Sequence, residues 1–177
     1  RPPGPLQVNP EAVAAAHALE AHKLSRVAVV DFDVHHGNGT EDCFKGNEHV
    51  LMVSTFQHPF YPYSGTEHPA ANMLNVPLGR GTDGEEFRRV VSDLWMPRLR
   101  EFQPEMIFIS AGFDAHYEDE MGGLSLLEKD YAWVTEQVKQ IADESAQGRI
   151  VSMLEGGYSL SALARSVVCH LRVLADF

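Results

Sequence analysis

One stretch of this chain reads Asp31-Phe32-Asp33-Val34-His35-His36-Gly37-Asn38-Gly39-Thr40 and follows a strongly apolar segment. In an extended backbone every second side chain points to the same side, so Asp31, Asp33 and His35 can converge on one centre. Carboxylate oxygen and imidazole nitrogen together suit zinc, whose catalytic sites use three protein ligands and keep a fourth position open. The stretch therefore predicts part of a metal site, and a further ligand has to come from another segment.

Apolar runs of strand length alternate with segments of helical periodicity along the chain. The expected buried strands are Arg26–Phe32, Val50–Ser54, Glu105–Ser110 and Arg149–Leu154. The expected helices are Glu11–Lys23, Asp83–Phe102 with a kink at Pro97, Leu126–Ala146 and Ser159–Ala175. This alternation predicts one α/β domain over residues 1–177, with a mostly parallel sheet and helices on both faces. Residues Thr55–Met73 are expected to form a long, irregular and functional connection.

Composition narrows the class of protein. With 177 residues and 44% hydrophobic residues the chain can bury a sizeable core. The 25 acidic and 14 basic residues give a net charge of -11, which opposes a phosphate backbone, so we expect no direct nucleic-acid partner. Two cysteines without C-x-x-C spacing suit a reducing compartment. No apolar run is long enough for a bilayer and no signal peptide is recognisable, so we expect a cytoplasmic protein without a membrane partner.

Chemically capable side chains follow all four predicted strands. The first strand ends at Asp33 and His35 and the second at Ser54, whereas the third leads into Ser110-Ala111-Gly112-Phe113-Asp114-Ala115-His116 and the fourth into Leu154-Glu155-Gly156-Gly157-Tyr158. Parallel α/β sheets bind ligands beyond the carboxyl ends of their strands. The sequence therefore predicts a common rim that brings together Asp33, His35, Asp114 and Tyr158.

These three motifs, in this order, resemble those of the zinc-dependent histone deacetylase family. The Leu-Glu-Gly-Gly-Tyr form is similar to class II and bacterial members, which include acetylpolyamine amidohydrolases. The resemblance covers nearly the whole chain from Val13 onward. It implies an arginase/deacetylase-like α/β fold, here incomplete on its N-terminal side. It also implies hydrolysis of acetyl groups from acetyl-lysine side chains of peptides or proteins, or from acetylated polyamines, in the cytoplasm or, in a eukaryote, the nucleus.

The resemblance also implies roles for individual residues. Asp33, His35 and Asp114 would hold zinc, and Tyr158 would donate its hydroxyl to the substrate carbonyl. A structural potassium ion behind the zinc would be held at Asp31, Asp33, His35, Ser54 and Thr55. The backbone at Gly156 and Gly157 would approach the acyl-lysine channel closely. Phe60 and Tyr61 in the long connection either wall that channel or pack the loop down.

The chain departs from the family at its beginning. Arg1-Pro2-Pro3-Gly4 matches a family motif, but Pro5-Leu6-Gln7-Val8-Asn9-Pro10 follows where family members carry two adjacent histidines that move protons. His17 and His22 are separated by about 140° on a helix and cannot form such a pair, and His36 should point away from the metal. We therefore expect a fragment or a divergent member with impaired catalysis, or alternatively a non-catalytic, zinc-containing acetyl-lysine-binding or vestigial domain.

A second interpretation concerns Asp114-Ala115-His116, which also suggests the two-manganese ureohydrolases, whose fold is related. That interpretation requires further carboxylates beside Asp33 and Asp114 on the same rim, and the sequence offers no convincing set. We therefore do not favour the two-manganese interpretation, and we expect His116 to be a rim or surface residue.

Overall fold

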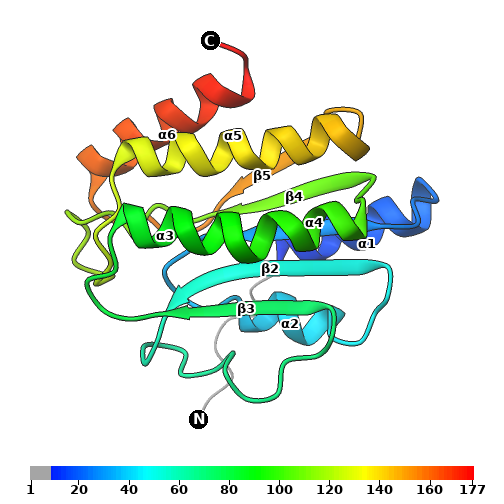
Figure 1. The fold of residues 1–177 in the computed structure, drawn as a ribbon, viewed down its shortest axis with the longest axis horizontal. Coiled ribbons are helices and arrows are strands. Elements are labelled where there is room, and N and C mark those ends of the chain that lie inside the picture. Colours follow the sequence, from blue (N-terminus) through cyan, green and yellow to red (C-terminus); the bar gives the residue numbers. More distant parts are fainter. Residues whose placement is uncertain (1–8) are drawn as a thin grey trace.

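The computed structural model describes residues 9–177 and is built around a five-stranded sheet (Figure 1). The strands are β1 (Val27–Asp31), β2 (Val50–Gln57), β3 (Met73–Leu78), β4 (Met106–Ala111) and β5 (Ile150–Leu154). They run parallel in the order β3-β2-β1-β4-β5. All five residues of central β1 are buried, which explains its unbroken apolar run. The predicted α/β fold with a parallel sheet is confirmed.

The helices are α1 (Pro10–Ala21), α2 (Asn38–Phe44), α3 (Gly84–Val90), α4 (Met96–Phe102), α5 (Glu128–Ser145) and α6 (Leu160–Leu174). Asn9 caps α1 by accepting the N–H of Ala12, next to Pro10 at the first helical position. A π-helical turn, Val91–Trp95, joins α3 to α4. Because Pro97 has no amide hydrogen to donate, the expected interruption of this helix takes the form of that wider turn.

Two apolar layers cover the sheet. In Figure 1 helices α3, α4 and α5 lie in front of the sheet, where their side chains pack on Val30, Val53 and Ile109. Helix α1 lies behind, where its alanines pack on Val29 and Met52. Helix α6 packs along α5. The predicted helices on both faces are therefore confirmed. Within residues 9–177, no helix combines the length and the apolar character that crossing a bilayer requires.

The sequence did not indicate α2 or β3. Helix α2 buries only two residues and so shows little periodicity, and β3 is an edge strand that contains Pro77, a residue tolerated there but not in central strands. Strand β2 also continues beyond Ser54 to Gln57. The irregular connection is therefore residues 58–72, shorter than the predicted Thr55–Met73.

Candidate metal centre

The loops that follow β1 and β4 bring three potential ligands together. Asp33, His35 and Asp114 each offer one ligand atom, and these atoms lie within 4.8 Å of one another. His35 Nδ1 is 3.1 Å from Asp33 Oδ1 and 3.1 Å from Asp114 Oδ2. Ligands bonded to a tetrahedral zinc at about 2.0–2.1 Å lie about 3.3 Å from one another. The separation and the chemistry of this donor set therefore fit a small divalent ion.

The sheet register explains why these distant residues meet. Strands β1 and β4 are hydrogen-bonded neighbours in which Asp31 pairs with Ser110, so both strands end at the same level. Beyond that level Val34 N–H donates to Asp114 Oδ1 at 2.9 Å, which ties the two loops to each other. Parallel strands thus place the third ligand 79 residues away from His35 in sequence but next to it in space.

Backbone donors hold the oxygens of both carboxylates. Gly156 N–H donates to Asp33 Oδ2 at 2.8 Å, while Val34 N–H binds the outer oxygen of Asp114. His35 N–H donates to Asp33 Oδ1 at 2.9 Å. Contacts of this kind orient metal ligands and hold them in place.

Two glycines are required by the close packing around the ligands. A Cβ on Gly156 would lie deep inside van der Waals contact with the carboxylates of Asp114 and Asp33, and one on Gly112 would overlap Asp33. Gly157 has a φ of +146°, which side-chain-bearing residues rarely adopt. The structure thus places Gly156 against the ligands themselves. Gly112 belongs to the quoted motif, but sequence reasoning assigned it no role.

The carboxylates of Asp33 and Asp114 lie so close together that a positive charge is needed between them. Hydrogen bonds that the His35 imidazole donates to Asp114 and Asp33 raise the pKa of His35 to about 10. Burial raises the pKa of Asp114 to about 6, although the hydrogen bond with His35 opposes that rise. In the ion-free site a proton on His35 therefore supplies the positive charge, and a metal ion has to displace it.

Asp31 does not join this donor set, contrary to the simple expectation from strand alternation. Strand β1 ends at Asp31, and its Oδ1 accepts the N–H of Asp33 at 3.0 Å, so its carboxylate caps the turn that follows the strand. Burial and the charge of Asp33 raise the pKa of Asp31 well above its usual value. In the sheet register Asp31 lies beside Ser54, and Ser54 and Thr55 are both buried.

The other histidines have separate surroundings. The imidazole of His36 bonds to Ser64 Oγ at 2.8 Å and to Glu41 Oε2 at 2.6 Å, as expected for a side chain that does not bind the metal. His116 is fully buried, with Nδ1 accepting a backbone N–H, so its predicted rim or surface location was wrong. The rings of His17 and His22 pack edge to face at 5.2 Å, and neither lines the pocket described next.

A pocket of about 690 Å³ opens onto the ligands. Asp33 and His35 line it together with Tyr158, a residue that is 57% exposed. Phe60 stacks on the His35 ring at a centroid distance of 5.4 Å, and Tyr61 meets the same ring edge-on at 6.2 Å. Three of the four residues that the strand ends predict for the rim, Asp33, His35 and Tyr158, thus line one pocket, and Phe60 and Tyr61 both contact the His35 ring.

One wall of this pocket is strongly acidic. Glu11, Asp31 and Glu155 line it, and no lysine or arginine of the described chain does. Burial and a hydrogen bond with Glu11 raise the pKa of Glu155 to about 8. Sequence reasoning missed this carboxyl pair, because Glu11 looked like an ordinary acidic residue in the first turn of a helix.

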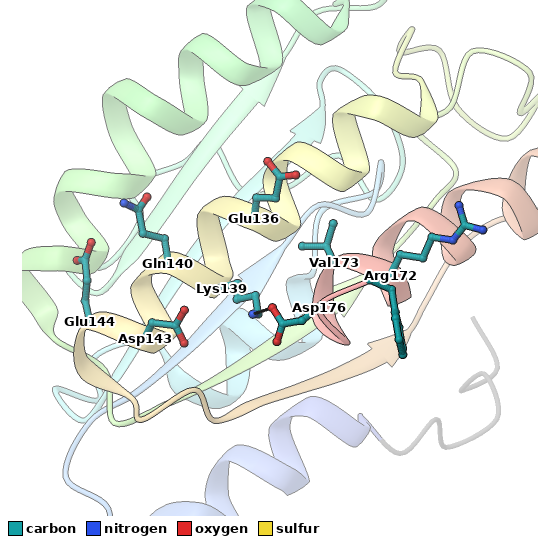
Figure 2. Close-up of a pocket in the computed structure, with 9 residues that line it drawn as sticks. Glu136, Lys139, Gln140, Asp143, Glu144, Arg172, Val173 and Asp176 are labelled. Carbon is teal, nitrogen blue, oxygen red and sulfur yellow. Dashed lines mark hydrogen bonds and ion pairs between the residues drawn. The ribbon is translucent and has the colours of Figure 1, made fainter.

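A second hollow, of about 640 Å³, lies between the C-terminal parts of α5 and α6 (Figure 2). Its walls carry exposed charges of both signs, including the ion pair between Lys139 and Asp176. Helices α5 and α6 begin near the carboxyl edge of the sheet and end away from it (Figure 1). This hollow contains none of the three ligands and is not the candidate site.

The fold and the site define an α/β protein with a two-carboxylate, one-imidazole group that could hold a metal ion at the carboxyl edge of a parallel sheet. Residues 7–174 match the family model described as "Histone deacetylase domain". The chain is 38% identical to type-2 histone deacetylase 2 of Dictyostelium discoideum over 96% of its own length and 11% of that protein. It is 36% identical to a histone deacetylase-like amidohydrolase of Pseudomonas aeruginosa, over 84% of its own length and 41% of that protein.

Solved structures agree with these sequence relatives. The histone deacetylase Clr3 superposes with a TM-score of 0.88 at 30% identity, covering 100% of this chain and 32% of that one. The chain therefore belongs to the histone deacetylase family, whose named relatives are deacetylases and amidohydrolases. It spans less than half the length of each of these relatives.

Binding of a divalent ion should release a proton. Because His35 holds its proton up to about pH 10 in the ion-free site, zinc binding at pH 7.5 should release roughly one proton per ion. Calorimetric titrations in two buffers of different ionisation enthalpy measure this number. A binding enthalpy that does not depend on the buffer would contradict the assignment of His35 as a ligand.

The carboxyl pair of Glu11 and Glu155 should make the protein less stable as the pH rises. The pKa of Glu155 is raised from 4.5 to about 8, so its contribution to the free energy of unfolding is present below pH 4.5 and is lost as the pH rises through 8. Glu11→Gln removes the opposing charge, so the ion-free variant should melt above the wild type at pH 8.5 and not at pH 5. Glu20→Gln, on the exposed part of α1, is the control. An equal difference in melting temperature at both pH values would be evidence against the pair.

Proposed function

We propose that this chain is a zinc-dependent amidohydrolase that removes acetyl groups from acetyl-lysine side chains or acetylated polyamines. The observation that supports this most is the donor set of Asp33, His35 and Asp114, of which Asp33 and His35 line one pocket with Tyr158. Family membership supplies the reaction class, and the net charge of -11 favours substrates that carry positive charge.

Each residue of the site would have a definite task. Zinc, when bound by Asp33, His35 and Asp114, would polarise the acetyl carbonyl and make a water acidic enough to react. The Tyr158 hydroxyl would donate a hydrogen bond to the carbonyl oxygen as that oxygen gains negative charge. Phe60 and Tyr61 would guide the alkyl chain of the substrate past the His35 ring. Gly156 and Gly157 would let the backbone lie close to the reacting group.

We also propose a structural potassium ion next to this centre. Asp31 is buried and its pKa is raised, so a cation beside it would relieve the cost of a buried charge. Ser54 is its partner in the sheet register, and Thr55 follows directly. The Ser54 hydroxyl and backbone carbonyl groups at these positions are the oxygen ligands that such an ion uses.

Proton transfer would be the weak step of this chain. The six residues that follow Gly4 contain no histidine, and the His36 imidazole is already bonded to Glu41 and Ser64. We therefore propose impaired turnover, with a non-catalytic zinc-containing acetyl-lysine-binding domain as the second candidate. The free cysteines, Cys43 and Cys169, suit a reducing cytoplasmic or nuclear setting.

Turnover of an acetyl-lysine amide in excess zinc discriminates the two functions. The wild type should release acetate slowly, and Asp114→Ala should abolish both acetate release and stoichiometric zinc binding. Asp143→Ala, at the distant hollow of Figure 2, is the control and should match the wild type. Stoichiometric zinc binding without any acetate release would favour the non-catalytic domain.

Tyr158→Phe tests the proposed hydroxyl donor. Loss of one donor to a developing oxyanion typically slows a reaction by roughly 10²–10³-fold. Tyr158 is largely exposed, so the variant should fold and bind zinc as the wild type does. We expect a fall in kcat of about 10²-fold, measured as acetate release at saturating substrate. A rate within threefold of the wild type would remove Tyr158 from the mechanism.

A further inference from the structure

One buried histidine outside the metal centre joins three elements of the fold. His170 on α6 is 3% exposed, and both of its ring nitrogens have hydroxyl partners. Nδ1 lies 2.7 Å from Thr135 Oγ1 on α5, and Nε2 lies 2.8 Å from Ser152 Oγ on β5. A single imidazole therefore fixes α6 to its neighbouring helix and to the edge of the sheet.

The hydrogen bonds around His170 specify one form of the ring. The Thr135 hydroxyl donates its hydrogen to the Tyr131 carbonyl at 2.6 Å, so its oxygen has to accept from His170. Nδ1 therefore carries the hydrogen, and Nε2 accepts from the Ser152 hydroxyl. Burial lowers the pKa of His170 to about 4, in agreement with a neutral ring.

The same ring packs against the backs of both ligand loops. Its centroid is 6.1 Å from that of Phe32 and 5.7 Å from that of Phe113, in edge-to-face arrangements. Phe32 is directly followed by the ligand Asp33, and Phe113 by the ligand Asp114. A shift of either phenyl ring would therefore move the backbone that carries a ligand. We call the four rings of Phe32, Phe113, Tyr131 and His170 the aromatic platform.

Within the aromatic platform only His170 is anchored by side-chain hydrogen bonds in the described structure. Tyr131 packs on Phe113 at 5.0 Å and on Phe32 at 5.9 Å, but its buried hydroxyl has no partner there. Apolar packing alone tolerates small shifts, whereas ligands have to be held within about 0.5 Å of their productive positions. The two hydrogen bonds of His170 supply the missing directional constraint.

We propose that His170 is a positioning residue that holds Phe32 and Phe113 and thereby fixes Asp33 and Asp114 at the separation required by a divalent ion. This proposal rests on the proposed function in one respect, because both assume that Asp33, His35 and Asp114 bind the metal. The proposal concerns the geometry of the donor set, so it can be tested without any turnover.

Metal affinity of variants tests this proposal directly. His170→Phe keeps a ring but removes both hydrogen bonds, and Ser152→Ala removes one. Leu99→Ala, in the fully buried part of α4, is a destabilising control remote from both loops. Zinc affinity is measured by competition with a chromophoric chelator on protein shown to be folded by circular dichroism. We expect losses of about tenfold for His170→Phe, as for outer partners of metal ligands, and about threefold for Ser152→Ala.

Leu99→Ala should bind zinc within twofold of the wild type. Affinities of His170→Phe and Ser152→Ala equal to that of Leu99→Ala would overturn the proposal, and if His170→Phe does not fold, Ser152→Ala decides alone. Nitrogen-15 NMR of the wild-type imidazole should also show a hydrogen on Nδ1 and no titration above about pH 5. Titration near pH 6.5, or a hydrogen on Nε2, would equally overturn it. Absence of acetate release would instead count against the proposed function and leave this proposal standing.

Discussion

Two buried carboxylates that face one imidazole are the constraint on which the rest of the site depends. Asp33 and Asp114 both lie 3.1 Å from His35 Nδ1, and like charges at this range persist only with positive charge between them. The backbone N–H of Val34 donates to Asp114 and that of Gly156 donates to Asp33, and these hydrogen bonds hold both carboxylates in place. A bound proton or a bound cation is therefore a requirement of this geometry rather than an addition to it.

Further acidic groups surround the three proposed ligands. The chain carries a net charge of -11, and the carboxyl groups of Glu11, Asp31 and Glu155 line the pocket without a lysine or arginine of the described chain among its lining residues. The negative net charge attracts cations to the protein, and a cation in this pocket would meet no opposing positive side chain among its lining residues. Burial and neighbouring carboxyl groups raise the pKa values of Asp31 and Glu155. Without a cation nearby, these two groups therefore keep protons that they would lose in water.

The sequence was informative where local pattern and chemistry coincide. The strand ends predicted that Asp33, His35, Asp114 and Tyr158 would share a rim, because parallel strands must end at the same edge. The sequence was uninformative where a side-chain contact joins two segments that are distant in the chain and share no motif. Nothing in the pattern of α6 links His170 to Thr135 and Ser152, and nothing in the first turn of α1 indicates that Glu11 meets Glu155.

The central claim is that one ion is held by Asp33, His35 and Asp114, and X-ray absorption of the zinc-loaded protein tests it most directly. The account predicts only oxygen and nitrogen neighbours at about 2.0–2.1 Å, with the multiple scattering of a single imidazole. A sulfur neighbour at about 2.3 Å, which would indicate Cys43 or Cys169, or the scattering of two or more imidazoles, would contradict it.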